Sequence, residues 1–204
     1  MSEYSNSSQT VFIVDDDPAI RIGMQALMES VNIQHEVFAS ADDFLQREED
    51  HRAGCLVLDI RMPGLGGLEL QDELISRGNT LPIIFITGHG DVPMAVDAMQ
   101  KGAVDFIQKP FRDQELLDRI REALLTDKER REEREQHAAV ESRLEKLTNR
   151  EREVFDLVVT GKPNKVIAYE LDVSQRTVEI HRARVMEKME ARSLADLVRM
   201  HISL

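Results

Sequence analysis

The sequence predicts an α/β doubly wound, five-stranded parallel sheet, joined by a helical linker to an all-α four-helix domain that contains a helix–turn–helix. Short apolar runs alternate with helical patterns over residues 10–126, as expected for a parallel sheet covered by helices. Mixed-sign charge without Gly or Pro fills residues 127–145 and favours a solvated connecting helix. Short helical patterns with capping residues then fill residues 146–204. We therefore expect two domains and a linker with these boundaries.

The apolar runs of the first domain end at polar or chain-breaking residues, as buried strands do. The expected strands are Val11–Val14, Ile33–Phe38, Leu56–Leu58, Leu81–Ile86 and Val104–Ile107. Pro18 suits the first turn of a helix, and Asp91 and Asp113 can cap later ones. The expected helices cover about 18–30, 41–47, 68–77, 91–101 and 113–126. Ligands bind at the carboxyl ends of the strands in such sheets, so the residues after each strand are the candidates for chemistry.

The last domain begins with Thr148 and Glu151, which have the spacing of a capping box. Gly161 and Pro163 end this first helix. The next helices are expected at about 164–171, 175–189 and 193–202, and the last is expected to bury Leu194, Leu197, Val198 and Ile202. Residues 161–189 have the length and rhythm of a helix–turn–helix.

Composition narrows the class of protein. Of 204 residues, 42% are hydrophobic and 31% are charged, which is ordinary for a globular protein. No apolar run approaches the roughly 18 residues of a membrane span. The lone Cys55 excludes an internal disulfide and a cysteine-based zinc site. We expect a cytoplasmic protein that does not enter a membrane.

The net charge of −12 is unevenly distributed along the chain. Residues 1–126 hold 10 Lys/Arg and 22 Asp/Glu, whereas residues 146–204 hold 11 and 9. An acidic first domain and a slightly basic last domain indicate two different kinds of partner.

Polar residues follow four strands that are neighbours in a doubly wound sheet. They are Asp15–Asp17, Asp59, Thr87 and Lys109. Clustered carboxylates suit a hard cation such as Mg²⁺, and one carboxylate can attack phosphorus to form an aspartyl phosphate. Phosphoryl transfer needs charge neutralisation, which Mg²⁺, an ammonium and a hydroxyl supply. Taken singly, these residues would be read as a helix cap, a turn residue and a surface lysine; together they predict a phosphoryl-transfer site.

Four motifs at these strand ends resemble the signature set of bacterial two-component receiver domains, over about residues 10–126. The motifs are Val14–Asp17, Leu58–Pro63, Ile86–Gly90 and Lys109–Phe111. The resemblance implies that Asp59 accepts the phosphoryl group and that Thr87 and Lys109 contact it. It also implies a Mg²⁺ site in which Asp16, Asp59 and the backbone carbonyl of Arg61 bind the ion directly and Asp15 acts through water. Phe106 matches the position of the family's switch aromatic, and we expect its ring to pack in the core.

The third helix of the last domain carries several basic side chains that suit a helix in the major groove of DNA. Asn164 and Lys165 begin the preceding helix, where side chains and backbone N–H groups can bind phosphate. The candidate DNA contacts are Asn164, Lys165, Arg176, Thr177, Val178, His181, Arg182, Arg184 and Lys188. Ile180 and Met189 are expected to anchor the helix inward.

Three segments resemble the LuxR/NarL-type DNA-binding domain, in particular its FixJ subgroup: Leu147–Glu151, Gly161–Ala168 and Ser174–Arg182. The carboxylate of Glu179 departs from the wider pattern, in which Lys is common, and could accept from cytosine. The combined resemblance implies a response regulator and transcription factor, not an enzyme with an external substrate. Its implied partners are a sensor histidine kinase, double-stranded promoter DNA, RNA polymerase and, when phosphorylated, a second copy that binds through the Asp91–Phe111 face.

Two other functions are compatible with parts of the sequence. The acid pocket could belong to an enzyme that hydrolyses an external phosphate ester, although no separate general acid or substrate-enclosing domain is evident. Residues 146–204 could instead form a protein-binding module of a phosphorylation-controlled adaptor. Duplex binding that is lost in Lys165→Ala and Arg182→Ala and falls steeply with salt would exclude the adaptor.

Overall fold

The computed structural model describes residues 9–47, 52–88 and 92–204. The chain separates into two compact units, residues 1–130 and 131–204. Within the described residues, no helix is both long enough and apolar enough to cross a membrane.

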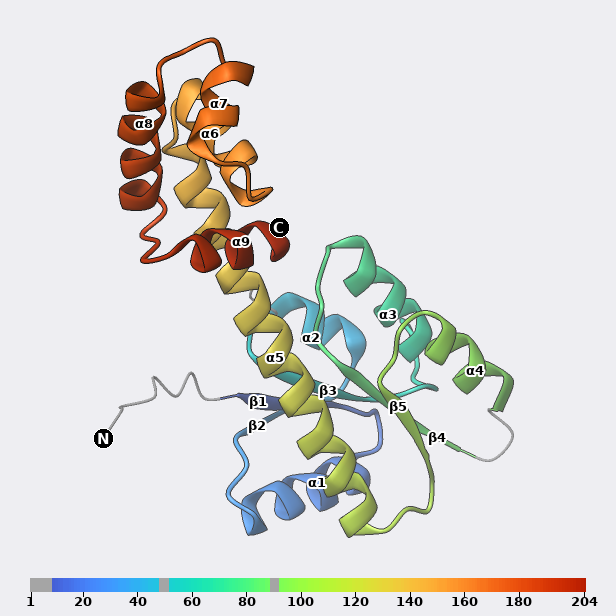
Figure 1. Ribbon diagram of the computed structural model, residues 1–204. Helices are drawn as coiled ribbons and strands as arrows, with labels where there is room; N and C mark the ends of the chain where they lie inside the picture. The colour runs from blue at the N-terminus through green and yellow to red at the C-terminus, as the bar shows by residue number, and fades with distance from the viewer. Residues whose placement is uncertain (1–8, 48–51, 89–91) are drawn as a thin grey trace. The chain divides into compact units, whose positions relative to one another are not determined.

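The first unit is built on a parallel sheet with strand order β2-β1-β3-β4-β5 (Figure 1). The strands are β1 (Thr10–Val14), β2 (His35–Phe38), β3 (Gly54–Asp59), β4 (Ile83–Thr87) and β5 (Asp105–Gln108). The helices are α1 (Pro18–Ser30), α2 (Ala41–Arg47), α3 (Gly67–Ser76), α4 (Val92–Gln100) and α5 (Asp113–Glu145). The predicted doubly wound five-stranded sheet is therefore confirmed. Asp91, expected to cap α4, lies outside the described residues.

Alternate residues of each strand point to opposite faces of the sheet and contribute to two separate hydrophobic cores. Phe12, Leu56 and Phe85 pack with α2, α3 and α4 on one face. On the other face, residues such as Ile13 and Val57 pack with α1 and the first part of α5. Figure 1 shows these helix layers on either side of the sheet. This sandwich leaves the carboxyl ends of the strands uncovered at one edge.

Helix α5 does not stop near residue 126 but continues to Glu145. Its sequence has no Gly or Pro to interrupt it, and its charged residues are good helix formers. The expected solvated linker is also packed near both of its ends. Asp127 is buried in the first unit, and Val140 and Leu144 are buried in the second.

Asp127 is held at the amino-terminal end of the sheet. Its Oδ2 accepts from the backbone N–H of Gly54 at 2.9 Å and from Gln9 Nε2 at 3.2 Å. Gly54 has φ +149°, and a Cβ there would lie 1.8 Å from the carbonyl oxygen of Thr10. Only glycine fits at this start of β3, so the peptide that binds Asp127 depends on it.

The second unit contains the four predicted helices: α6 (Asn149–Val159), α7 (Asn164–Glu170), α8 (Gln175–Lys188) and α9 (Leu194–Ile202). The Thr148–Glu151 capping box is present, and Ser174 and Ser193 cap α8 and α9. These helices share a core with the end of α5, made by Val140, Leu144, Val154, Phe155, Val158, Ile167, Val178, Val185, Met189 and Leu197.

Three expectations for buried side chains in this unit are wrong. Ile180 is 48% exposed, whereas Val178, two residues earlier and on the other side of the helix, is fully buried. The phase of α8 is set by Val178, Val185 and Met189, which leaves Ile180 on the outer side. In α9, Leu197 is buried as expected, but Leu194 at the first turn is 38% exposed and Ile202 at the last turn is 76% exposed, because both lie at ends of the helix, beyond the core.

Candidate phosphoryl-transfer site and nucleic-acid interface

The ends of β1 and β3 bring three carboxylates together. Asp15 and Asp59 are buried and Asp16 is exposed. One oxygen from each lies within 4.8 Å of the others. Because β1 and β3 are paired strands, residues that are distant in sequence meet here, as the strand-end argument predicts.

Lys109 enters this cluster from the end of β5. Its Nζ donates to Asp15 Oδ2 at 2.8 Å and to Asp59 Oδ1 at 3.0 Å. The side chain of Lys109 is only 25% exposed, so these ion pairs are partly shielded from water. One ammonium therefore serves two carboxylates, with Asp16 close by.

Burial raises the pKa of Asp59, and the hydrogen bond and charge of Lys109 oppose this only in part. For Lys109, burial lowers the pKa, but its hydrogen bonds to Asp15 and Asp59 outweigh burial and leave the pKa raised. Lys109 is therefore a cation at neutral pH. Three carboxylates face a single ammonium, an excess of negative charge that a divalent cation would neutralise.

Thr87 is buried at the end of β4, beside Lys109. The backbone N–H of Lys109 donates to the carbonyl of Thr87 at 2.7 Å, which continues the β4–β5 pairing by one step. The sheet thus holds the hydroxyl and the ammonium at the same edge.

Neighbouring residues hold the acid cluster in place, and sequence reasoning missed the contacts of Arg21 and Gly67. The N–H of Asp17 donates to Asp15 Oδ1 at 2.9 Å, while Asp17 itself caps α1. Arg21 donates to the carbonyl of Asp15 at 2.6 Å. A Cβ on Gly67 would lie 2.3 Å from the carbonyl of Asp59, so the loop can close over β3 only with glycine. The Gly66–Gly67 pair was the available signal for this close approach.

Phe106 does not pack in the core as expected: its side chain is 41% exposed. It lies on β5, the edge strand next to β4, and pairs in register with Phe85. Its neighbour Ile107 is buried instead. Val96 and Met99 of α4 are also exposed, so the α4–β5 side of the first unit carries uncovered apolar side chains.

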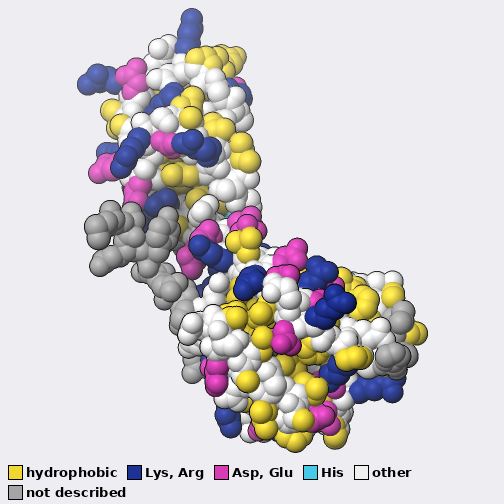
Figure 2. All heavy atoms as spheres, turned by 90° about the horizontal axis from the view of Figure 1, so that it is seen from below, with side chains coloured by type: hydrophobic (Ala, Val, Ile, Leu, Met, Phe, Trp, Pro, Cys, Tyr) yellow, Lys and Arg dark blue, Asp and Glu magenta, His cyan; other side chains and the backbone are white. Residues whose placement is uncertain are grey.

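In the second unit, the basic candidates fall into two groups. Lys165, Arg176 and Arg184 are exposed on α7 and α8, and Lys and Arg side chains stand out from this unit (Figure 2). Arg182 instead donates to Asn164 Oδ1 at 3.0 Å and ties α8 to the start of α7. This hydrogen bond links the two helices of the pair.

Other candidates at the amino-terminal half of α8 are partly engaged. The hydroxyl of Thr177 lies 2.8 Å from Ser174 Oγ in the N-cap of α8. His181 is half-buried, and its Nδ1 has no hydrogen-bond partner among the described residues.

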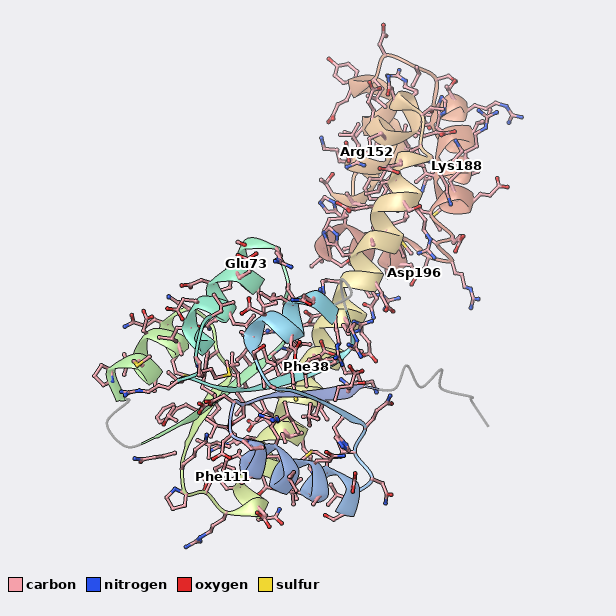
Figure 3. All side chains as sticks on the ribbon, turned by 180° about the vertical axis from the view of Figure 1, so that it is seen from behind. Phe38, Glu73, Phe111, Arg152, Lys188 and Asp196 are labelled. Atoms are coloured by element: carbon pink, nitrogen blue, oxygen red, sulfur yellow. The ribbon has the colours of Figure 1, made fainter. Side chains whose placement is uncertain are left out.

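Two other candidate DNA contacts make internal contacts in this unit. Val178 is fully buried, so its side chain cannot reach a base. Lys188 lies along α8 (Figure 3) and donates to Glu151 Oε2 at 2.6 Å and to the carbonyl of Lys146 at 2.9 Å. The hydrogen bond from Lys188, followed by that from the Thr148 backbone, lowers the pKa of Glu151 to about 2. Lys188 therefore neutralises a buried carboxylate.

The outer side of α8 opposite Val178 has a mixed chemical character. It presents Arg176, Glu179, Ile180, Ala183, Arg184 and Glu187. Sequence reasoning placed Ile180 in the core because an apolar residue two positions from Val178 fits a core position equally well. Basic, acidic and apolar side chains are therefore all exposed on this face.

Comparison with known proteins matches both halves of the chain. The family described as response regulator receiver domain matches residues 11–121, and the family described as bacterial regulatory proteins, luxR family, matches residues 145–201. The fold and the acid site thus belong to a two-component signalling protein with a DNA-binding output. The chain is a member of the response regulators that join a receiver domain to a LuxR-type DNA-binding domain.

Its relatives include FixJ-like regulators. It is 49% identical to nodulation protein W of Bradyrhizobium diazoefficiens, over 96% of this chain and 86% of the relative. It is 45% identical to the transcriptional regulatory protein FixJ of Rhizobium meliloti, over 95% of each. The structure of response regulator StyR matches with a TM-score of 0.88 at 44% identity, covering 97% of this chain and 100% of that one. Full-length FixJ from B. japonicum matches with a TM-score of 0.61 at 39% identity, over 96% of each.

Proposed function

We propose that a sensor histidine kinase phosphorylates this response regulator on Asp59, which promotes dimerisation and sequence-specific DNA binding and so activates transcription in the cytoplasm. The observation that carries this proposal is the position of Lys109, whose ammonium lies on both Asp15 and Asp59. Because the ammonium of Lys109 already contacts the acceptor carboxylate, it can stabilise the negative charge of a phosphoryl group attached there.

Asp15, Asp16, Asp59 and the backbone carbonyl of Arg61 would hold Mg²⁺. The donor set fits, because oxygen ligands and an excess of carboxylates suit this hard cation. When bound, Mg²⁺ neutralises charge on the phosphoryl oxygens. The domain boundaries proposed for this activity are residues 10–126 for the receiver, 127–145 for the linker and 146–204 for DNA binding.

The chain's own residues then have defined roles. An oxygen of Asp59 attacks the phosphorus of the kinase phosphohistidine, so a P–O bond forms as the P–N bond breaks. The ammonium of Lys109 and the hydroxyl of Thr87 donate to the transferred group. Loss of the group to water restores Asp59. The receiver thus acts only on its own phosphoryl group, and no external substrate is proposed.

Phosphorylation would change the surface on the α4–β5 side of the receiver. When Thr87 moves toward the phosphoryl group, β4 shifts relative to β5, and Phe106 responds as the switch residue. Burial of Phe106 and rearrangement of Val96 and Met99 would complete a homodimer face within Asp91–Phe111.

The dimer would place two α8 helices on successive half-sites of promoter DNA. Lys165, Arg176 and Arg184 would contact phosphates, with Asn164 and Arg182 fixing the helix pair. Thr177, Ile180 and His181 would face bases. An activator bound there contacts RNA polymerase.

The decisive test combines intact mass and gel filtration after incubation with Mg²⁺ and acetyl phosphate. The wild-type chain should gain one phosphoryl group and shift to a dimer, while Asp59→Asn should do neither. Asp17→Asn is a matched control, because asparagine keeps the α1 cap while removing one nearby charge. Modification of Asp59→Asn, or no modification of the wild type, would refute the proposed acceptor.

A further inference from the structure

The receiver end of the linker is held to the sheet by a buried carboxylate. Asp127 is 2% exposed, and every residue of α5 from 128 to 139 is exposed or half-buried. Asp127 is therefore the last point at which the interior of the first unit grips this helix. Burying a carboxylate is costly, and an apolar side chain could fill such a position at a lower cost. Asp127 is thus placed for something other than hydrophobic packing.

Hydrogen bonds at two points fix this part of α5 against the sheet. Asp127 Oδ2 accepts from the backbone N–H of Gly54 at 2.9 Å and from Gln9 Nε2 at 3.2 Å. Gln9 Nε2 also donates to the carbonyl of Leu124, about one turn earlier in α5, at 2.6 Å. Gln9 directly precedes β1, and Gly54 begins β3. Because hydrogen bonds are directional, these contacts fix the rotation of α5 about its axis as well as its position.

Strand β3 joins this contact to the phosphoryl-transfer site. Gly54 is the first residue of β3, and Asp59 is the last. A strand of this length spans roughly 16 Å. It is paired on both sides, with β1 and with β4, so it is a stiff element inside the sheet. The proposed phosphoryl acceptor and the receiver end of the linker are therefore attached to opposite ends of one strand.

Helix α5 continues from this contact into the second unit. It is one uninterrupted helix from Asp113 to Glu145. Val140 and Leu144, near its end, belong to the core of the second unit. Because each turn of a helix is hydrogen-bonded to the next, a rotation imposed at one end is passed to the other. A slip of one residue at the sheet would turn the far end of α5 by about 100°.

We propose that Asp127 is a positioning residue that fixes the rotation of the linker helix, and that phosphorylation of Asp59 increases DNA binding only while Asp127 holds the N–H of Gly54. This inference rests on the proposed function, because it assumes that phosphorylation increases DNA binding. Fixing the register of a helix is the best-attested use of a buried polar side chain, and such a residue is kept although it lowers stability.

The first test compares duplex affinity with and without phosphorylation. A duplex is selected from a random library with the wild-type chain treated with Mg²⁺ and acetyl phosphate. Intact mass gives the phosphorylated fraction, and fluorescence anisotropy gives the duplex Kd. Phosphorylation should tighten wild-type binding at least about fivefold, the lower end of the range for coupled sites. Asp127→Ala should be phosphorylated to the same extent, but its gain in affinity should fall below about twofold.

Matched variants separate the hydrogen bond from charge and from general damage. Asp127→Asn keeps an oxygen that can accept from Gly54 and should keep most of the gain. Glu129→Ala removes an exposed carboxylate of the same helix and should leave the gain unchanged. A full gain in Asp127→Ala would overturn the inference, as would an equal loss in Asp127→Asn, which would assign the effect to charge. A wild-type chain without any gain would instead refute the proposed function.

A second experiment leaves the buried contact untouched, so it does not depend on the folding of Asp127→Ala. One alanine inserted after Glu133, an exposed residue of α5, turns the rest of the helix by about 100° and should abolish the gain. Seven alanines inserted at the same point return the helix to within about 20° of its original phase and should restore most of the gain. Equal gains in the two insertion variants, whether full or lost, would overturn the inference.

Discussion

Lys109 Nζ lies 3.0 Å from Asp59 Oδ1 while it also bonds Asp15. The cation that would stabilise a transferred phosphoryl group is thus already shared between the acceptor and a neighbouring carboxylate. Removing charge from Asp59 should therefore affect stability as well as signalling.

Asp59→Asn should stabilise the chain at neutral pH. Burial raises the pKa of Asp59 above its unfolded value despite the opposing effect of Lys109. A raised carboxyl pKa adds stability at low pH, and this stability is lost as pH rises through the folded pKa. The neutral amide avoids that loss, so its Tm should be a few degrees higher than wild type near pH 7.5, with the difference vanishing near pH 4.

Calorimetry over this pH range in metal-free buffer measures the effect. A Tm for Asp59→Asn below wild type at neutral pH would contradict it. Asp17→Asn, in which the cap of α1 is kept, controls for the loss of one negative charge at the same edge.

Mg²⁺ should raise the Tm of the wild-type chain. A ligand at about 100 times its Kd stabilises the folded state by about 2.7 kcal/mol if the unfolded chain does not bind it. Asp16→Asn should lose most of this shift, because Asp16 is one of the three clustered carboxylates. Asp17→Asn should keep it. Equal shifts in wild type and Asp16→Asn would place the ion elsewhere.

Val178→Ala should lower stability, whereas Ile180→Ala should weaken DNA binding. Val178 is fully buried, so truncation should cost on the order of 1–3 kcal/mol and lower the Tm of the second unit. Ile180 is half exposed, so its truncation should leave the Tm nearly unchanged and weaken binding to a selected duplex. Calorimetry measures the Tm of both variants, and fluorescence anisotropy measures their duplex affinity. A lower Tm for Ile180→Ala together with an unchanged Tm for Val178→Ala would contradict this orientation of α8.

Glu151→Gln should destabilise the second unit above about pH 5 and much less at pH 3. Lys188 and the Thr148 backbone hold the pKa of Glu151 at about 2, below its ordinary value of 4.5. A lowered carboxyl pKa gives stability that is present above the unfolded pKa and is lost as pH falls toward the folded one. The cost at pH 6 should be roughly 1–3 kcal/mol, the range for a charged hydrogen bond.

Unfolding of the variant and wild type at each pH tests this difference. A constant difference between pH 6 and pH 3 would show that packing, not ionisation, is lost. Lys188→Met should reproduce the loss at pH 6, because it leaves Glu151 buried without its cation.

The clustering of Asp15, Asp16, Asp59 and Lys109 could be predicted because strand ends bring these residues together. Asp59 and Lys109 each follow a short apolar run, and parallel strands send such residues to one edge. The order of strands and helices along the chain could be predicted from the alternation of short apolar runs with helical patterns. These features depend on local patterns, which a single sequence displays.

The remaining features depend on contacts that local patterns do not show. Val178 and Ile180 are both β-branched, so composition does not reveal which one faces the core; the packing of α8 decides it. Asp127 reads as the first residue of a charged run, yet its buried carboxylate accepts a hydrogen bond from the backbone N–H of Gly54, 73 positions away. Phe106 reads as core, but an edge strand leaves it uncovered.

Within the described residues, each of the three buried hydrophobic clusters belongs to a single unit. A substitution at Gly54 would therefore disrupt the receiver while leaving the second unit able to fold. In a cell carrying one such allele beside an intact copy, the damaged chain could neither be phosphorylated nor dimerise, so it would not compete for operators. Receiver mutations at this position should consequently be recessive, whereas mutations in the core of the second unit should be dominant, because their receivers can still pair with intact copies.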